Sequence, residues 1–128
     1  MVLVDSSVWV RVEHERVDLA ELVPNEPIAT CPIVIMELLR GTRSAKKYET
    51  TRDMLMAVEL LDDPTPLIRF EEAARIYLRC RDAGVTPSAV DCLVAACAIA
   101  HGIPLVHDDT DFDHISRVVT RLQLFTRS

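Results

Sequence analysis

The sequence has no excess of basic residues. Its 128 residues include 14 Lys and Arg against 20 Asp and Glu, which gives a formal net charge of -6 at pH 7. Proteins that coat nucleic acids usually carry a broad basic surface that contacts phosphates. The acidic balance argues against that class, and binding of a nucleic acid would need local basic patches.

The sequence also has no apolar run of about 18 residues, the length that a membrane-spanning helix needs, and no basic segment at its start. We therefore expect no membrane span, no signal peptide and no membrane partner. The four cysteines, at positions 31, 80, 92 and 97, include no Cys-x-x-Cys pair. Isolated cysteines, two of them in strongly apolar sequence, are typical of buried reduced thiols, which favours a cytoplasmic protein.

Several catalytic signatures are missing as well. There is no Gly-x-Ser-x-Gly motif of a serine hydrolase. Ser7 stands where a phosphoaspartyl hydrolase has its second aspartate, and no Lys follows Lys47, although a receiver domain needs one near its last strand. The four histidines are scattered, and the sequence shows no His/Cys cluster with metal-ligand spacing. These absences leave the carboxylates as the candidates for chemistry.

What the sequence does contain is an alternation of short apolar runs and helical patterns. It has no linker, internal repeat or low-complexity segment, so we predict a single domain over residues 1–128. The alternation predicts an α/β fold with a mostly parallel central sheet covered by helices on both faces. In such folds ligands bind beyond the carboxyl ends of the strands.

The patterns also predict the bounds of the elements. Strands are expected at 2–4, 28–30, 67–68 and 103–107, with a possible edge strand at 122–125. Helices are expected around 8–12, 17–23, 32–40, 44–61, 71–83 and within 86–102, and an acidic loop at 108–113.

The longest apolar helix carries one acid. Every residue from 89 to 100 is apolar except Asp91, and Thr-Pro-Ser before this run and Gly102 after it are typical of capped helix ends. A helix that is apolar all round should be buried, and an unpaired buried carboxylate is unfavourable. Asp91 either completes a capping box with Ser88 or belongs to a functional site.

Other acids stand in similar places. Asp5 follows the first strand, Glu37 is the only acid of the second apolar helix, and four aspartates in six residues follow the strand at 103–107. Each has a simpler explanation: Asp5 could cap the next helix, and Glu37 could face solvent or pair with Arg40.

Taken together, these acids predict a metal site. Mg²⁺ and Mn²⁺ prefer hard oxygen ligands and bind through a few carboxylates. Such an ion can polarise a phosphoryl oxygen and activate a water molecule. We therefore expect hydrolysis of a nucleic-acid backbone, with Mg²⁺ as the cofactor and Mn²⁺ as a possible substitute.

Three stretches carry a family resemblance: VLVDSSVW, IVIMELLRGT and AVDCLVAACAIAHGIPLVHDDTDFDHI. The chain resembles PIN-domain ribonucleases, and its size is similar to that of the VapC-type toxins of bacterial toxin–antitoxin pairs. The resemblance implies a three-layer α/β/α sandwich with catalytic and metal-binding acids at Asp5, Glu37, Asp91 and Asp109. Asp111 would assist or replace Asp109, and Ser7 matches a polar residue that in the family helps to hold the metal or phosphate region.

The resemblance also implies an activity and partners: a Mg²⁺-dependent endoribonuclease that cleaves tRNA or rRNA and stops translation, a homodimer, and a cognate antitoxin in a toxin–antitoxin complex that can be of higher order. Exposed basic residues beside the second apolar helix are candidates for contacts with RNA or antitoxin: Arg40, Arg43, Lys46 and Lys47. Two alternatives stay open. One is a housekeeping PIN nuclease of RNA maturation, and the other is a catalytically inactive binding module.

Overall fold

Four short parallel strands form the central sheet, in the order β3-β2-β1-β4. They are β1 (Val2–Val4), β2 (Ile28–Thr30), β3 (Glu59–Leu60) and β4 (Leu105–Val106). In the register of the sheet, Leu3 of β1 lies between Ala29 of β2 and Leu105 of β4. This is a computed structural model, and it describes residues 1–126. The all-parallel pairing confirms the predicted α/β fold.

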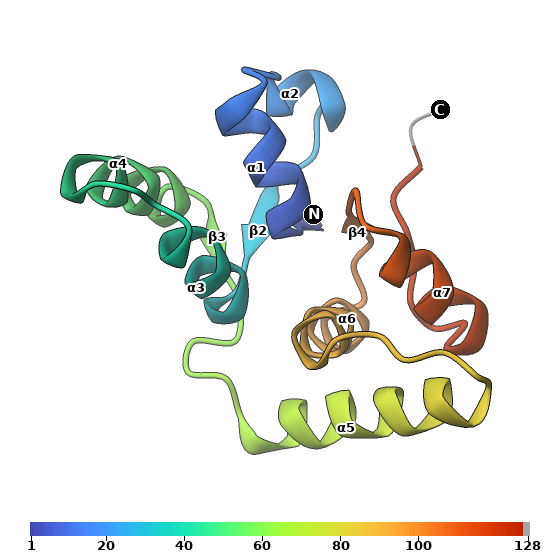
Figure 1. Cartoon of the computed structure of the whole chain (residues 1–128). Helices are drawn as coiled ribbons and strands as arrows, with labels where there is room; N and C mark the ends of the chain where they lie inside the picture. Colours follow the sequence, from blue (N-terminus) through green and yellow to red (C-terminus); the bar gives the residue numbers. More distant parts are fainter. Residues whose placement is uncertain (127–128) are drawn as a thin grey trace.

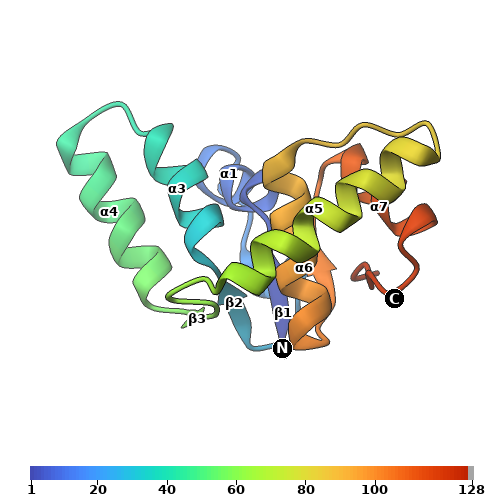
Figure 2. The ribbon, with the colours of Figure 1, turned by 90° about the horizontal axis from the view of Figure 1, so that it is seen from below.

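Seven helices surround the sheet in the described part of the chain. They are α1 (Ser6–His14), α2 (Leu19–Leu22), α3 (Pro32–Arg40), α4 (Ala45–Met56), α5 (Leu67–Asp82), α6 (Ala89–His101) and α7 (Thr110–Val118). α1 and α2 lie on one side of the strands and α5 and α6 on the other (Figure 1). In the second view, α5 and α6 lie in front of the sheet and α1 behind it (Figure 2). The three-layer α/β/α arrangement is thus confirmed.

α6 is the central helix of the core. All of its residues from 91 to 98 are buried. Four of them are alanines or cysteines in a row, at 95–98, and these small side chains allow close packing against the sheet and α5. The helix begins after Ser88, whose side chain caps it, and ends at Gly102, which has the left-handed φ of 63° that glycine adopts readily. The predicted ends of this helix are therefore confirmed. None of the helices within residues 1–126 is long and apolar enough to span a membrane.

The prediction was wrong about the third strand. The helix expected to continue to residue 61 ends at Met56, and residues 59–60 form β3. Residues 67–68, expected as a strand, instead begin α5, where Leu67 is 74% exposed. Val58 and Leu61 continue the apolar spacing of α4, so periodicity alone could not locate the end of that helix.

The region after β4 also differs from the prediction. β4 is shorter than expected, and much of the acidic segment at 108–113 forms the first turn of α7, which Asp109 caps. Residues 122–125 do not form a strand, although Leu124 makes a single parallel bridge with Leu105. α1 begins at Ser6, earlier than predicted, because Asp5 caps it.

Candidate active site

Asp5 lies at the carboxyl end of β1, where the strand meets α1. Only 2% of the residue is exposed. Its Oδ2 accepts hydrogen bonds from the backbone N–H of Ser7 at 3.1 Å and from the Ser7 hydroxyl group at 2.6 Å. Its Oδ1 is buried and has no hydrogen-bond partner among residues 1–126. Burying a carboxylate oxygen without a hydrogen-bond partner is energetically unfavourable. A cation bound to Oδ1 would remove this cost.

Ser7 joins the ends of two neighbouring strands. Besides donating to Asp5, its hydroxyl oxygen accepts a hydrogen bond of 3.0 Å from the backbone N–H of Asp108. Asp108 follows β4, so this contact fixes the segment that carries Asp109 relative to Asp5. The acidic side chain of Asp108 itself is exposed and lies 3.6 Å from Arg11.

Asp91, Asp109 and Asp111 form an acidic cluster. Each offers a carboxylate oxygen, and these oxygens all lie within 4.8 Å of one another. Asp91 comes from the first turn of α6 and the other two from the beginning of α7. Asp109 accepts the backbone N–H of Asp111 at 2.9 Å, which holds the two in a fixed relation. Both candidates for the fourth acid therefore belong to the same cluster.

The structure also tests whether the Asp91 side chain caps its helix. The backbone N–H of Asp91 donates to the hydroxyl group of Ser88 at 3.1 Å, as in a capping box. The reciprocal bond is absent within the described residues, because the N–H of Ser88 donates to Asp111 at 3.4 Å instead. The Asp91 carboxylate is thus left to the acidic cluster.

Burial and mutual repulsion make these carboxylates hard to ionise. Burial, followed by the charge of Asp109 and a hydrogen bond with Asp111, raises the pKa of Asp91 to about 8. Burial also raises the pKa of Asp5, with a smaller contribution from Asp109, while the bonds from Ser7 partly oppose the rise. Such pKa values indicate a pocket with more negative charge than it can hold without a counter-ion.

Glu37 of α3 lies at the border of this cluster and is half-buried. The hydroxyl group of Ser6 donates to its Oε1 at 3.1 Å. Burial raises its pKa most, Asp5 and Asp109 raise it further, and Ser6 and Arg40 lower it. The negative charges of Asp5 and Asp109 therefore act on the Glu37 carboxyl group. The role of Ser6 in positioning Glu37 was not predicted from the sequence, although Ser6 stands between Asp5 and Ser7.

Two of the predicted basic residues lie near Glu37. Arg43 and Lys47 line one hollow of about 250 Å³ together with Glu37 and Glu13. Lys47 Nζ lies 3.7 Å from Glu13. Arg40 acts on Glu37 through its charge, whereas Lys46 is exposed on α4 and lies outside the lining of this hollow.

The donor set fits a hard divalent cation. Asp91, Asp109 and Asp111 offer oxygen ligands close enough to share one ion. Asp5 lies outside that group of three, but its charge raises the pKa of Asp91 and its Oδ1 is unpartnered within residues 1–126, so it is a further candidate ligand. Mg²⁺ and Mn²⁺ bind through a few carboxylates and keep several water molecules. We therefore describe these residues, with Glu37, as the candidate metal centre.

Known proteins are similar to this chain in sequence and in fold. Residues 2–118 match the family model of the PIN domain. Ribonuclease VapC11 of Mycobacterium tuberculosis is 38% identical, and the match covers 96% of both chains. Among solved structures, a chain of VapBC2 from Rickettsia felis, bound to a DNA fragment from its promoter, superimposes with a TM-score of 0.79 and 20% identity over 100% of both chains. VapC20 of Mycobacterium tuberculosis, a sarcin–ricin loop cleaving toxin, has a TM-score of 0.65 and 19% identity over 88% of this chain and 93% of its own.

Proposed function

The chain belongs to the PIN-domain family, and on this premise we propose that it is a Mg²⁺-dependent endoribonuclease, the toxin of a toxin–antitoxin pair, acting in the cytoplasm as a single domain. The proposed catalytic and metal-binding residues are Asp5, Glu37, Asp91 and Asp109, with Ser7 and Asp111 in supporting positions. The observation that carries the proposal is the convergence of these carboxylates from separate elements into a pocket that raises the pKa of Asp5, Glu37 and Asp91.

In this proposal Asp5, Asp91 and Asp109 hold the ion, with Asp111 beside them. Mg²⁺ bound there would polarise a phosphoryl oxygen of the RNA backbone and lower the pKa of a coordinated water molecule. The protein contributes the positions of the ligands. Ser7 fixes the orientation of Asp5 through its 2.6 Å hydrogen bond and holds the segment before Asp109 in place. Loss of a residue that orients a metal ligand in this way typically lowers metal affinity or activity about 10- to 100-fold.

Glu37 is the acid best suited to proton transfer. Its raised pKa brings it closer to neutral pH than an ordinary glutamate, which favours general acid–base catalysis. The Ser6 hydroxyl group holds Oε1. Oε2 is therefore the atom that we propose takes the proton from the attacking water.

The relatives support a proposal for the substrate class. VapC11 is named a ribonuclease, and VapC20 is described as cleaving the sarcin–ricin loop, which supports a structured RNA, tRNA or rRNA, as the substrate here. Cleavage of either would inhibit translation. Arg40, Arg43, Lys46 and Lys47 would guide the RNA backbone to the acids or contact the antitoxin. The hollow that Arg43 and Lys47 share with Glu37 supports this role.

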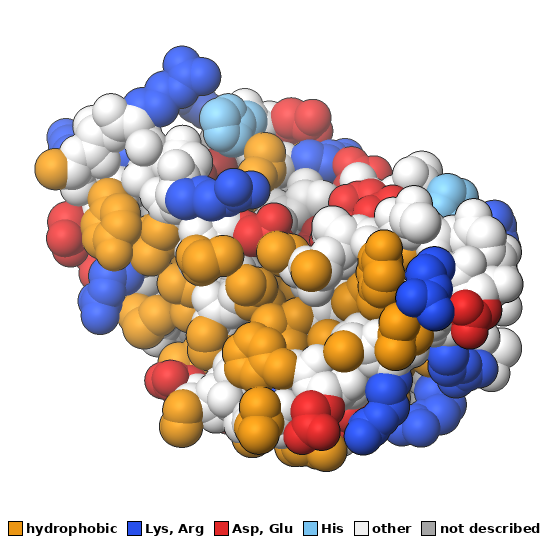
Figure 3. All heavy atoms as spheres, turned by 60° about the horizontal axis from the view of Figure 1, so that its bottom comes forward, with side chains coloured by type: hydrophobic (Ala, Val, Ile, Leu, Met, Phe, Trp, Pro, Cys, Tyr) orange, Lys and Arg blue, Asp and Glu red, His pale blue; other side chains and the backbone are white. Residues whose placement is uncertain are grey.

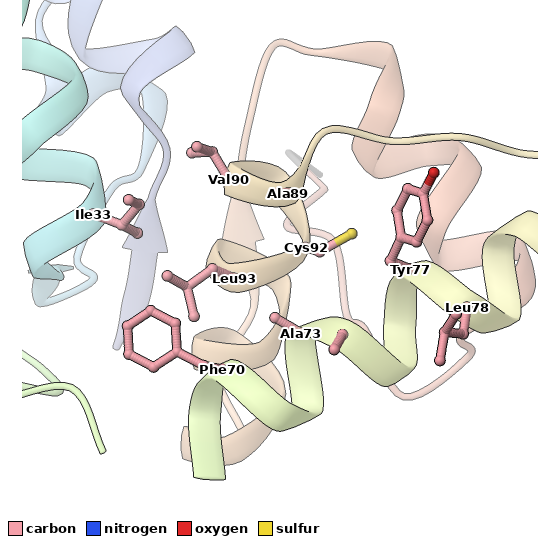
Figure 4. A pocket seen from close by; sticks show the side chains of 10 residues that line it. Ile33, Phe70, Ala73, Tyr77, Leu78, Ala89, Val90, Cys92 and Leu93 are labelled. Atoms are coloured by element: carbon pink, nitrogen blue, oxygen red, sulfur yellow. The ribbon is translucent and has the colours of Figure 1, made fainter. Parts of the chain in front are cut away.

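The partner class is supported by the solved structures, which include VapBC complexes from several bacteria. We propose that the chain binds a cognate antitoxin and forms a homodimer, with higher-order complexes built from both. An apolar groove of about 460 Å³ between α3, α5 and α6 is the surface that we assign to the homodimer. Its lining includes Ile33, Phe70, Tyr77 and Leu93 (Figure 4). Hydrophobic side chains cover much of the molecular face around it, which favours a protein partner (Figure 3).

The deciding experiment is a cleavage assay on total tRNA and rRNA with the purified chain. We expect cleavage with Mg²⁺ or Mn²⁺ and none with EDTA. A chain that binds metal but cleaves no RNA would favour the inactive binding module. Cleavage without a gene for an antitoxin beside the reading frame would favour the housekeeping nuclease.

A further inference from the structure

A second group of potential metal ligands lies at the opposite end of α6 from Asp91. Asp62, Cys97 and His101 offer one ligand atom each, and these atoms all lie within 4.8 Å of one another. His101 Nε2 is 2.8 Å from Asp62 Oδ1. Asp91 and His101 are ten positions apart on α6, which corresponds to about 15 Å along the helix axis, so this group is separate from the candidate active site.

Cys31 adds a second thiol. It lies at the junction of β2 and α3, where no side chain caps the helix. Interaction with the Cys97 thiol lowers the pKa of Cys31, so the two thiols are neighbours. A cavity of about 10 Å³ has Cys31, Asp62 and Cys97 among its lining residues. The four side chains come from three segments that are distant in the sequence, which is why no metal-ligand spacing was visible there.

We propose that Cys31, Cys97, His101 and Asp62 bind a structural zinc ion. Zn²⁺ takes four ligands from Cys sulfur, His nitrogen and carboxylate oxygen in tetrahedral geometry, and soft thiolate ligands select it over Mg²⁺. Cys97 and His101 are four residues apart on one face of α6, as two ligands of one ion must be. This inference does not depend on the proposed nuclease activity.

Binding would require two adjustments. The first is that the Cys31 sulfur must move closer, because Cys31 lies outside the group of atoms that are all within 4.8 Å of one another. The second concerns the distance between His101 and Asp62. Bond lengths of about 2.0 Å place neighbouring nitrogen and oxygen ligands of tetrahedral zinc about 3.3 Å apart. His101 Nε2 and Asp62 Oδ1 are now 2.8 Å apart, so they would separate by about 0.5 Å. The side chain of His101 is 33% exposed and provides a route for the ion from solvent.

The charges of the site would also balance. Two thiolates, one carboxylate and a divalent cation leave one negative charge, and both thiols would release their protons on binding. The guanidinium group of Arg69 donates to Asp62 Oδ2 at 2.8 Å and is itself only 12% exposed. Its shorter bond is to the oxygen that does not face His101, and a second, longer bond of 3.4 Å goes to Oδ1. Arg69 can therefore neutralise the remaining charge through Oδ2, while Oδ1 would exchange the longer bond for the ion.

The test measures metal content and ligand type in the purified full chain. We expect one retained zinc per chain after extensive buffer exchange. With cobalt in place of zinc, we expect tetrahedral visible bands and a sulfur-to-cobalt charge-transfer band in the near ultraviolet. Cys97→Ser and His101→Gln should each reduce zinc retention at least tenfold, the scale on which metal affinity falls when a site is disturbed.

The controls separate this site from others. Cys80→Ser alters another fully buried cysteine outside the group, and Asp91→Asn alters the acidic cluster, so both should retain zinc and the charge-transfer band. His101 is at the surface, so its variant tests the site even if Cys97→Ser does not fold. A chain without zinc whose cobalt spectrum lacks the sulfur band would overturn the proposal and leave only an ion pair between Asp62 and Arg69. Loss of the sulfur band in Asp91→Asn, or its persistence in both ligand variants, would equally overturn it.

Discussion

The hydroxyl group of Ser7 donates a 2.6 Å hydrogen bond to Asp5 while its oxygen accepts the backbone N–H of Asp108. One side chain thus connects an acid at the end of β1 with the segment that follows β4. Asp5 also caps α1 with the same Oδ2, which leaves Oδ1 without a partner in the described structure. The local structure therefore fixes the Asp5 carboxylate: Oδ2 accepts the hydrogen bond that caps α1, and Oδ1 remains available to bind a cation.

Replacing Ser7 by Ala should weaken Mg²⁺ binding. The change removes the hydroxyl bond to Asp5 and the acceptor for Asp108, so we expect a loss of 10- to 100-fold in metal affinity or activity, as measured for similar partners of metal ligands. Titration of RNA cleavage with Mg²⁺ would measure this. Ser7→Thr keeps the hydroxyl group and should lose much less. Identical Mg²⁺ dependence in Ser7→Ala and the wild type would show that Ser7 does not position the metal ligands.

Removing one charge from the acidic site should abolish most cleavage. Asp5→Asn, Glu37→Gln and Asp91→Asn keep the shape of each side chain, and we expect rates to fall by roughly 10²- to 10³-fold, as when one electrostatic contributor to an active site is lost. Circular dichroism should show an intact fold. The matched control is Asp108→Asn, because Asp108 is exposed and lies beside the cluster without joining it. Equal losses in Asp108→Asn and Asp91→Asn would contradict this assignment of the acids.

The pKa of Asp91 predicts a specific pH dependence of stability without metal. Its pKa is about 8 in the folded chain and near 3.8 when unperturbed, so between these values the folded state retains a proton that the unfolded state has released. The free energy of unfolding should therefore fall as pH rises from about 4 to 8. The substituted side chain in Asp91→Asn cannot ionise, so this variant should be more stable than the wild type at pH 9 by roughly 1–3 kcal/mol. This is less than the free energy that corresponds to the whole pKa shift of Asp91, because the neighbouring acids titrate together with it.

Melting curves in EDTA at pH 5 and pH 9 would measure this difference. Added Mg²⁺ should raise the melting temperature of the wild type, since a ligand at 100 times its Kd stabilises the folded state by about 2.7 kcal/mol, and should affect Asp91→Asn far less. If the substitution lowers stability at both pH values and both proteins respond alike to Mg²⁺, Asp91 serves the helix end and not the metal.

The basic residues beside Glu37 should contribute to RNA affinity through phosphate contacts. Reversing the charges of Arg43, Lys46 and Lys47 in an Asp5→Asn background would allow binding to be measured without cleavage. Each lost phosphate contact reduces the slope of log affinity against log salt by about 0.7 for a single strand, so the triple variant should lower it by about 2. An unchanged affinity and slope would mean that these side chains only face solvent.

Local signals in the sequence were sufficient for several elements. The first two strands, the ends of α6 and the parallel sheet follow from apolar runs, Ser88 and Gly102, because these residues act on their own neighbours. The convergence of Asp5 with the segment after β4 could also be predicted, since parallel strands bring their carboxyl ends to one edge.

Other features depend on tertiary contacts that no local pattern carries. β3 has two residues and is defined by its pairing with β2, so the apolar spacing before it was assigned to α4. α7 begins where Asp109 caps it, and the density of acids there concealed a helix start. The proximity of Asp62 to Cys97 and His101 likewise arises only when the loop after β3 packs against the end of α6.

The bridge between Leu105 and Leu124 has a consequence for the solubility of the folded chain. Leu105 donates its N–H to Gln123 and accepts the N–H of Phe125, so the outward backbone groups of β4 are occupied. At the opposite margin of the sheet, β3 offers only two residues for pairing. Exposed sheet edges are templates on which other chains add strands and begin to aggregate. The β4 edge is covered and the β3 edge is very short, so the sheet gives other chains little opportunity to add strands. This holds even though the chain exposes a broad apolar face elsewhere.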